Sequence, residues 1–167
     1  MIRPFFLCAF ASLGLCVSHA HDSFEITLEI QEKRKSTVAK LEMARSTGVA
    51  ACDPTPSNGI LFDPAEFPAW QQRFQAAAPD LIQILDTESA LQLESATIGL
   101  NREDDIQIDY VFTPSSDPEL RLSAPILNRF PPDGFGVRVT YRDKSGRWHP
   151  PFMLFVDQQD SPLPPQK

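Results

Sequence analysis

Residues 24–30, with the sequence Phe-Glu-Ile-Thr-Leu-Glu-Ile, decide the fold class of this 167-residue chain. Apolar side chains occupy every second position from Phe24 to Ile30, and Glu or Thr occupies the positions between them. Successive side chains of a β-strand point to opposite faces, so this period of two predicts a strand with one buried and one solvated face.

Much of the chain has the same character. Six further stretches, which alternate or form short apolar runs, are predicted strands: 39–43, 90–98, 106–112, 120–124, 135–141 and 152–156. Polar or Gly-containing turns, such as 32–35 and 143–146, lie between them. Seven or eight short strands separated by turns predict a mainly β fold, an antiparallel immunoglobulin-like β-sandwich. The pattern leaves the order of the strands open.

Residues 64–86 interrupt the strands with one helical insertion. Asp63 suits the N-cap of a helix and Pro64 its first position. Aromatic side chains recur at helical spacing at Phe67, Trp70 and Phe74. Pro79 then divides the segment, and a second apolar helical face follows at Leu81, Ile82 and Leu85. We therefore expect two helical pieces within the insertion.

The first twenty residues are typical of a secretory signal peptide. Arg3 precedes the continuous apolar run 5–17, and the small residues Ser18 and Ala20 occupy positions −3 and −1 of a cleavage site. We expect cleavage after Ala20 and a periplasmic or secreted protein. A single β-sandwich domain is then expected over 21–160, with a disordered tail at 161–167 and no transmembrane segment after cleavage.

Charge and cysteine content narrow the function classes. Fifteen basic residues against 22 acidic ones give a net charge of −7, which argues against a nucleic-acid partner. Cleavage after Ala20 would leave Cys52 as the one cysteine, so no internal disulfide is expected and a core position suits this residue.

Two histidines are candidate metal ligands. After cleavage, His21 would carry the free α-amine, which can chelate a metal ion together with its imidazole Nδ1. His149, in the segment 148–151, is the other histidine of the processed chain. Nitrogen donors favour Cu(II) among the divalent first-row metals, so copper is the candidate cofactor. The alternative is a protein without a cofactor, in which His149 is an ordinary residue of a strand edge.

Two resemblances follow from these residues. A mature N-terminal histidine, His21, resembles that of secreted copper-binding β-sandwiches, namely CopC-type copper chaperones and lytic polysaccharide monooxygenases. Residues 103–156 begin with an acidic cluster, continue through LRLSA at 120–124 and FPPDG at 130–134, and end in two strands. This stretch resembles the extracytoplasmic β-sandwich of HupE/UreJ-type membrane proteins. The resemblance implies an exported module that serves a membrane or cell-envelope partner, or a metal.

Motifs of common enzyme classes are missing from the sequence. The chain has no Gly-x-Ser-x-Gly, His-Glu-x-x-His or Cys-x-x-Cys motif, and no residue is singled out as catalytic. We therefore expect an exported, non-enzymatic binding or accessory module of unknown ligand. The alternatives are a copper-binding periplasmic protein that uses His21 and His149, and a small secreted hydrolase or oxidase.

Overall fold

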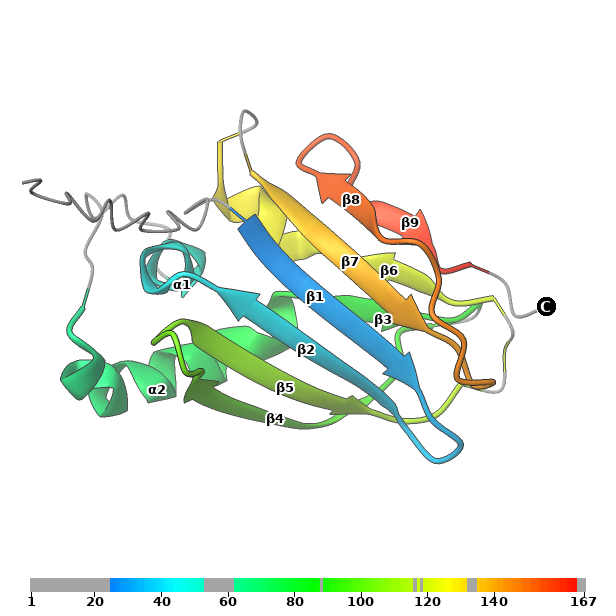
Figure 1. Ribbon diagram of the computed structural model, residues 1–167, viewed down its shortest axis with the longest axis horizontal. Helices are drawn as coiled ribbons and strands as arrows, with labels where there is room; N and C mark the ends of the chain where they lie inside the picture. The colour runs from blue at the N-terminus through cyan, green and yellow to red at the C-terminus, as the bar shows by residue number, and fades with distance from the viewer. Residues whose placement is uncertain are drawn as a thin grey trace, which may run out of the picture.

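A computed structural model describes residues 25–52, 62–87, 89–115, 117, 119–131 and 135–164. These residues form a mainly β fold with two sheets and two α-helices (Figure 1). The strands of the larger sheet, in order across it, are β4 (Leu93–Leu100), β5 (Ile106–Phe112), β2 (Thr37–Met43), β1 (Glu25–Glu32), β7 (Gly136–Arg142) and β8 (Phe152–Phe155). The smaller sheet has the order β3 (Gln83–Leu85), β6 (Arg121–Ser123) and β9 (Asp160–Pro162).

The core lies between the larger sheet and a layer made of the helices and the smaller sheet. Strands β2, β5 and β7 alternate between buried and more exposed residues, as their sequence pattern predicted. The largest fully buried side chains of the described residues include Tyr110, Tyr141 and Phe74. Burial of each large apolar side chain contributes about 1.5–3 kcal/mol relative to exposure, so the buried face of each strand adds to the stability of the fold.

The predicted start of the helical insertion is confirmed. Asp63 Oδ1 accepts a hydrogen bond from the Ala65 N–H at 2.9 Å, and Glu66 Oε2 accepts one from the Asp63 N–H at 3.3 Å. This capping box, with Pro64 after it, begins a short 3-10 turn (Pro64–Glu66) that continues into α2 (Phe67–Ala77) and a second 3-10 turn (Ala78–Asp80).

The second predicted helical piece is wrong. The chain leaves the helical conformation after Asp80, and Gln83–Leu85 form β3 opposite β6. Leu81 and Ile82 are buried on the way. A short apolar run has the same composition in a buried helix and in a buried strand, and pairing with β6 decides between them here.

A further helix, α1 (Arg45–Cys52), was not predicted. Its sequence contains Thr47, Gly48 and Val49, which have low intrinsic helix propensity. A Cβ atom at Gly48 would lie 3.0 Å from side-chain atoms of both Ile106 and Phe74. This glycine permits a close approach to the core, and the packing stabilises a helix that propensity alone does not indicate.

Two further features differ from the expected antiparallel sandwich and its tail. Strands β1 and β7 are parallel, with Glu25 level with Gly136, because alternation in sequence is the same for either direction of pairing. Three of the residues expected in the tail, 161–163, lie in or next to β9, where Leu163 is buried and its N–H donates to the Leu120 carbonyl. A third strand of the smaller sheet, with the sequence Asp-Ser-Pro, thus forms where a disordered tail was expected to begin.

None of the helices within the described residues is long and apolar enough to cross a membrane. A third 3-10 turn, Pro125–Arg129, connects β6 with the segment before β7. The buried side chains of Ile126 and Leu127 in this turn join the core of the layer opposite the larger sheet.

Candidate functional site

His149 lies in a compact pair with Asp143 at the turn between β7 and β8. Its Nε2 is 2.9 Å from Asp143 Oδ2, its ring stacks on Tyr141 with centroids 5.2 Å apart, and its side chain is 10% exposed. The His149 N–H also donates to the Tyr141 carbonyl at 2.9 Å. Backbone and ring contacts therefore both place this histidine beside β7.

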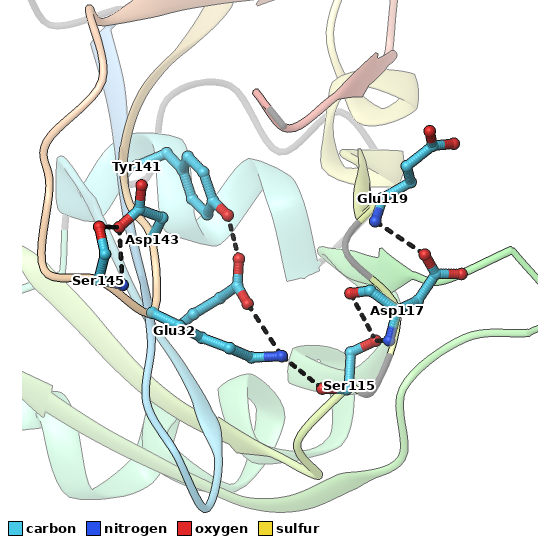
Figure 2. A network of polar contacts seen from close by, with 8 residues as sticks. Glu32, Ser115, Asp117, Glu119, Tyr141, Asp143 and Ser145 are labelled. Atoms are coloured by element: carbon cyan, nitrogen blue, oxygen red, sulfur yellow. Dashed lines mark hydrogen bonds and ion pairs between the residues drawn. The ribbon is translucent and has the colours of Figure 1, made fainter. Parts of the chain in front are cut away.

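The turn itself keeps Asp143 ionised. Burial raises the pKa of Asp143, but hydrogen bonds from Ser145, His149 and the Arg147 N–H outweigh that effect and hold it well below its usual range. The Ser145 N–H and Oγ–H both donate to Oδ1, at 2.9 and 2.5 Å (Figure 2). Asp143 thus acts as the acceptor that organises the β7–β8 turn.

A second buried group ties this turn to β1. The Glu32 carboxylate accepts a hydrogen bond from the Tyr141 hydroxyl and lies 3.6 Å from Lys144 Nζ (Figure 2). Lys144 Nζ in turn donates to the Ser115 carbonyl at 2.6 Å. Burial, followed by the hydrogen bond to Glu32, raises the pKa of Tyr141 far above its usual value. These groups satisfy one another, so we assign them to holding β1, β7 and the loop after β5 together.

The loop after β5 has polar contacts of its own. The Asp117 N–H donates to Ser115 Oγ at 2.9 Å, and the Glu119 N–H donates to Asp117 Oδ1 at 2.8 Å (Figure 2). The Thr87 hydroxyl donates to Asp117 Oδ2, and hydrogen bonds from Thr87 and Glu119 lower the pKa of Asp117. Ser115, whose carbonyl accepts from Lys144, is thus itself bonded to Asp117.

Of the two predicted copper ligands, the structure describes His149 alone. His21 lies outside the described residues, so the joint site of His21 and His149 stays a prediction. Glu25, the first described residue, is level with Gly136, whereas His149 bonds to Tyr141, which is level with Ile30. At a rise of about 3.3 Å per residue, these two levels are roughly 17 Å apart along the sheet. Joint coordination would require the chain before Glu25 to run back towards His149.

Other candidate ligands are not gathered within the described residues. No group of three or more His, Cys, Asp or Glu side chains that could hold a metal ion is found among them. Cys52 is partly buried and packs against the core at the end of α1. This position agrees with the core role expected for it.

The edge of the larger sheet at β4 is covered. Helix α2 lies beside it, and two glutamines one helical turn apart reach its backbone (Figure 1). Gln71 Nε2 donates to the Ile98 carbonyl at 3.3 Å, and Gln75 Nε2 donates to the Ala96 carbonyl at 3.2 Å. An exposed strand edge invites pairing with another chain, and a covering helix prevents it.

The opposite edge, at β8, carries apolar side chains in solvent. Trp148, Met153 and Phe155 are 48%, 40% and 48% exposed, and they are the exposed large hydrophobic residues of the described part of the chain. The guanidinium of Arg142 lies over the Trp148 ring, 5.6 Å from its centroid. We call these four residues, together with Arg138 opposite Met153, the β8 strip.

Strand register explains why these side chains share one face. Met153 lies opposite Arg138, Phe155 opposite Gly136, and Trp148 opposite Arg142. A Cβ atom at Gly136 would come within 2.9 Å of Met153 Cε and 3.2 Å of Phe155 Cε1. The glycine therefore gives both apolar side chains room to lie over the backbone of β7.

The backbone of β8 offers little for pairing with a further strand. The Phe155 N–H donates to the Gln158 carbonyl, and the Gln158 N–H donates to the Phe155 carbonyl, so the turn after β8 uses the outward groups of Phe155. Alternate residues of a strand present their backbone groups to the same edge, which leaves Met153 as the residue within β8 whose groups face outward. Pro150 and Pro151 come just before the strand.

The centre of the same sheet face is polar, and its side chains bond to one another. Lys40 Nζ lies 3.3 Å from Glu42 Oε2, and Gln107 Nε2 donates to Asp109 Oδ2 at 2.7 Å. A depression of about 140 Å³ lies there, with Arg138 on its border. The apolar β8 strip thus differs sharply from its neighbours on the face.

Sequence reasoning missed the β8 strip, although a signal was present. The run 152–156, Phe-Met-Leu-Phe-Val, has no polar residue, so both faces of that strand must be apolar. Only the strand order shows that β8 is an edge and that one of its faces is open.

Comparison with known proteins gives no family for this chain. No protein-family model matches it, and no curated protein matches it significantly.

Proposed function

We propose that the protein is an exported, non-enzymatic binding module that contacts a cell-envelope partner through the β8 strip. One observation carries this proposal: Trp148, Met153 and Phe155 gather at the sheet edge where no helix lies within the described part of the chain. Exposed aromatic side chains and Met, together with Arg, are enriched at protein interfaces, and clustered apolar groups in solvent are uncommon without a partner.

The polar cluster at the β7–β8 turn supports a binding role over an enzymatic one. Glu32, Tyr141 and Asp143 are buried and bonded to neighbouring groups of the protein. A catalytic centre would require such groups to converge on a cavity that admits a substrate. Here they hold the hairpin that presents the β8 strip.

We also propose that the protein is exported and that its two sheets form an immunoglobulin-like sandwich. The signal-peptide pattern of residues 1–20 supports export, and two facing, mostly antiparallel sheets support a sandwich of secreted type. Mass spectrometry of the protein from its host should find His21 as the first residue. A chain that retains Met1 would contradict export through cleavage.

Site-specific photocrosslinking in the host tests the binding role. A photoreactive phenylalanine analogue at position 148 or 155 should give one discrete crosslinked species. The same analogue at Thr97, which is exposed on the same sheet face near the covered edge, is the matched control and should give none. Absence of crosslinks from 148 and 155, or the same pattern from all three positions, would contradict the proposal.

Copper binding by His21 and His149 is the second candidate. Asp143 holds Nε2 of His149, and a carboxylate in this position commonly orients a histidine that binds metal through its other nitrogen. Calorimetric titration of the processed chain with Cu(II) should show tighter binding than a short peptide that begins with histidine. The gain should disappear in His149→Ala and when an extra residue precedes His21; equal affinity of chain and peptide would refute this candidate.

A further inference from the structure

The fold gives two methionines of the chain opposite surroundings. The sequence has three methionines, and cleavage after Ala20 would remove Met1. Met43 is 2% exposed at the end of β2, where it lies opposite Ile106 in the core. Met153 is 40% exposed within β8. An oxidant in solution reaches a thioether according to its exposure, so the fold protects one of these methionines and presents the other.

Met153 also lies between the two aromatic side chains of the β8 strip. Its partner on β7, Arg138, comes between the residues opposite Phe155 and Trp148. A Cβ atom at Gly136 would lie 2.9 Å from Met153 Cε and 3.2 Å from Phe155 Cε1, so the end of the thioether and this ring are close neighbours. A partner that covers both aromatic side chains would therefore cover Met153 as well.

We infer that Met153 is an oxidative modification site, at which conversion to the sulfoxide by a peroxide weakens binding of the envelope partner. This inference rests on the proposed function, because it concerns the regulation of the same surface. The thioether sulfur attacks one oxygen of the peroxide, the O–O bond breaks and an S–O bond forms. The sulfur is oxidised by two electrons. The proton of the transferred oxygen passes to the departing oxygen, which leaves as water or, from an organic hydroperoxide, as an alcohol.

The sulfoxide changes the middle of the strip from apolar to polar. Its oxygen accepts hydrogen bonds from water while the strip is exposed, so the modified protein stays folded. A partner that covers the strip removes this water, and a buried acceptor without a donor weakens binding about tenfold or more. A methionine sulfoxide reductase reverses the step with a dithiol, which becomes a disulfide, while the oxygen leaves as water.

Peptide mapping by mass spectrometry tests the site. The purified processed protein is treated with millimolar hydrogen peroxide, and the gain of one oxygen atom is followed at each methionine. Met153 should be oxidised at least about tenfold faster than Met43, because the core excludes the oxidant. Circular dichroism of the protein oxidised at Met153 should match that of the untreated protein. Equal rates at the two methionines would overturn the inference.

Photocrosslinking tests the effect on binding. The protein that carries the photoreactive phenylalanine analogue at position 148 is oxidised, freed of peroxide and then irradiated with the envelope fraction of the host. The partner thus never meets the oxidant. The yield of the crosslinked species should fall about tenfold or more, and it should recover after treatment with a methionine sulfoxide reductase and a dithiol. An unchanged yield after complete oxidation of Met153 would refute the inference.

Met153→Leu is the matched control, because leucine is apolar and similar in volume but forms no sulfoxide. Its crosslinking yield, measured against its own untreated sample, should not change with peroxide. The variant retains Cys52, the one thiol of the processed chain. A loss equal to that of the wild type would therefore assign the effect to another group and exclude Met153. Met153→Gln, which places a polar side chain here without any oxidant, should lower the yield as oxidation does.

The outcomes separate this inference from the proposed function. Crosslinking that persists after complete oxidation leaves the binding surface in place and removes its regulation through Met153. Absence of the crosslinked species from the untreated protein contradicts the proposed function, and the inference fails with it.

Discussion

The two edges of the larger sheet are built in opposite ways. At β4, helix α2 lies along the strand, and Gln71 and Gln75 donate to its outward carbonyls. At β8, no helix covers the strand within the described residues, and Trp148 and Phe155 remain about half exposed. One edge is closed by the protein itself, while the other presents side chains suited to an external partner.

From this contrast we propose that the fold separates stability at one edge from recognition at the other. The covered edge lies beside the aromatic cluster of α2. In this cluster Phe74 is fully buried, and its ring contacts those of Phe62, Phe67 and Trp70. The open edge relies on the polar contacts of its own hairpin, above all those of Asp143. Substitutions at the two edges should therefore have very different effects.

The largest effect is expected at the covered edge. Phe74→Ala removes a fully buried ring between α2 and the sheet, so it should lower the free energy of unfolding by about 3–5 kcal/mol. Urea denaturation followed by circular dichroism measures this. A loss below about 1 kcal/mol would mean that α2 contributes little to the core.

A smaller but pH-dependent effect is expected at the hairpin of the open edge. Asp143→Asn removes a buried, hydrogen-bonded charge and should cost about 1–3 kcal/mol at neutral pH. Because the pKa of Asp143 is lowered in the folded protein, its contribution is complete above the unfolded value of about 4 and is lost as the pH falls below it.

Unfolding curves at a series of pH values test that sign. The difference between wild type and Asp143→Asn should shrink as the pH falls below about 4. A difference of the same size at about pH 2 as at about pH 5 would show that the hairpin does not depend on the ionised carboxylate.

Uncovering the β4 edge should have a modest effect on stability and a visible one on association. Gln71→Ala combined with Gln75→Ala should cost about 1 kcal/mol, since both bonds lie near solvent. Light scattering should show more self-association than for Gln107→Ala, which removes a glutamine on the open sheet face. Equal behaviour of the two variants would mean that the glutamines do not protect the edge.

The smallest change in stability is expected in the β8 strip. Trp148→Ser and Phe155→Ser should each lower the free energy of unfolding by about 1 kcal/mol or less, because half of each side chain is already exposed. Thermal unfolding checks this. A loss similar to that of Phe74→Ala would show that the strip is part of the core and would remove the main support for a binding surface.

Much of the fold follows from local pattern, and the candidate surface does not. Alternation predicted the stretches that become β1, β2, β5 and β7, and Asp63 with Pro64 predicted the start of the helical insertion. The helix α1 and the strand β3 were missed because their local sequences favour no single conformation. His149 was chosen as a possible ligand, but its partner Asp143 could be recognised only once the turn was known.

The sequence alone determined which residues alternate, because the period of a strand is a local property of the backbone. It also placed Met153 in a run without polar residues. Only the tertiary structure decided that β1 pairs in parallel with β7, that α2 covers β4, and that β8 lies at an open edge. Strand order depends on contacts between residues far apart in the chain, and those contacts are what leave Trp148, Met153 and Phe155 in solvent.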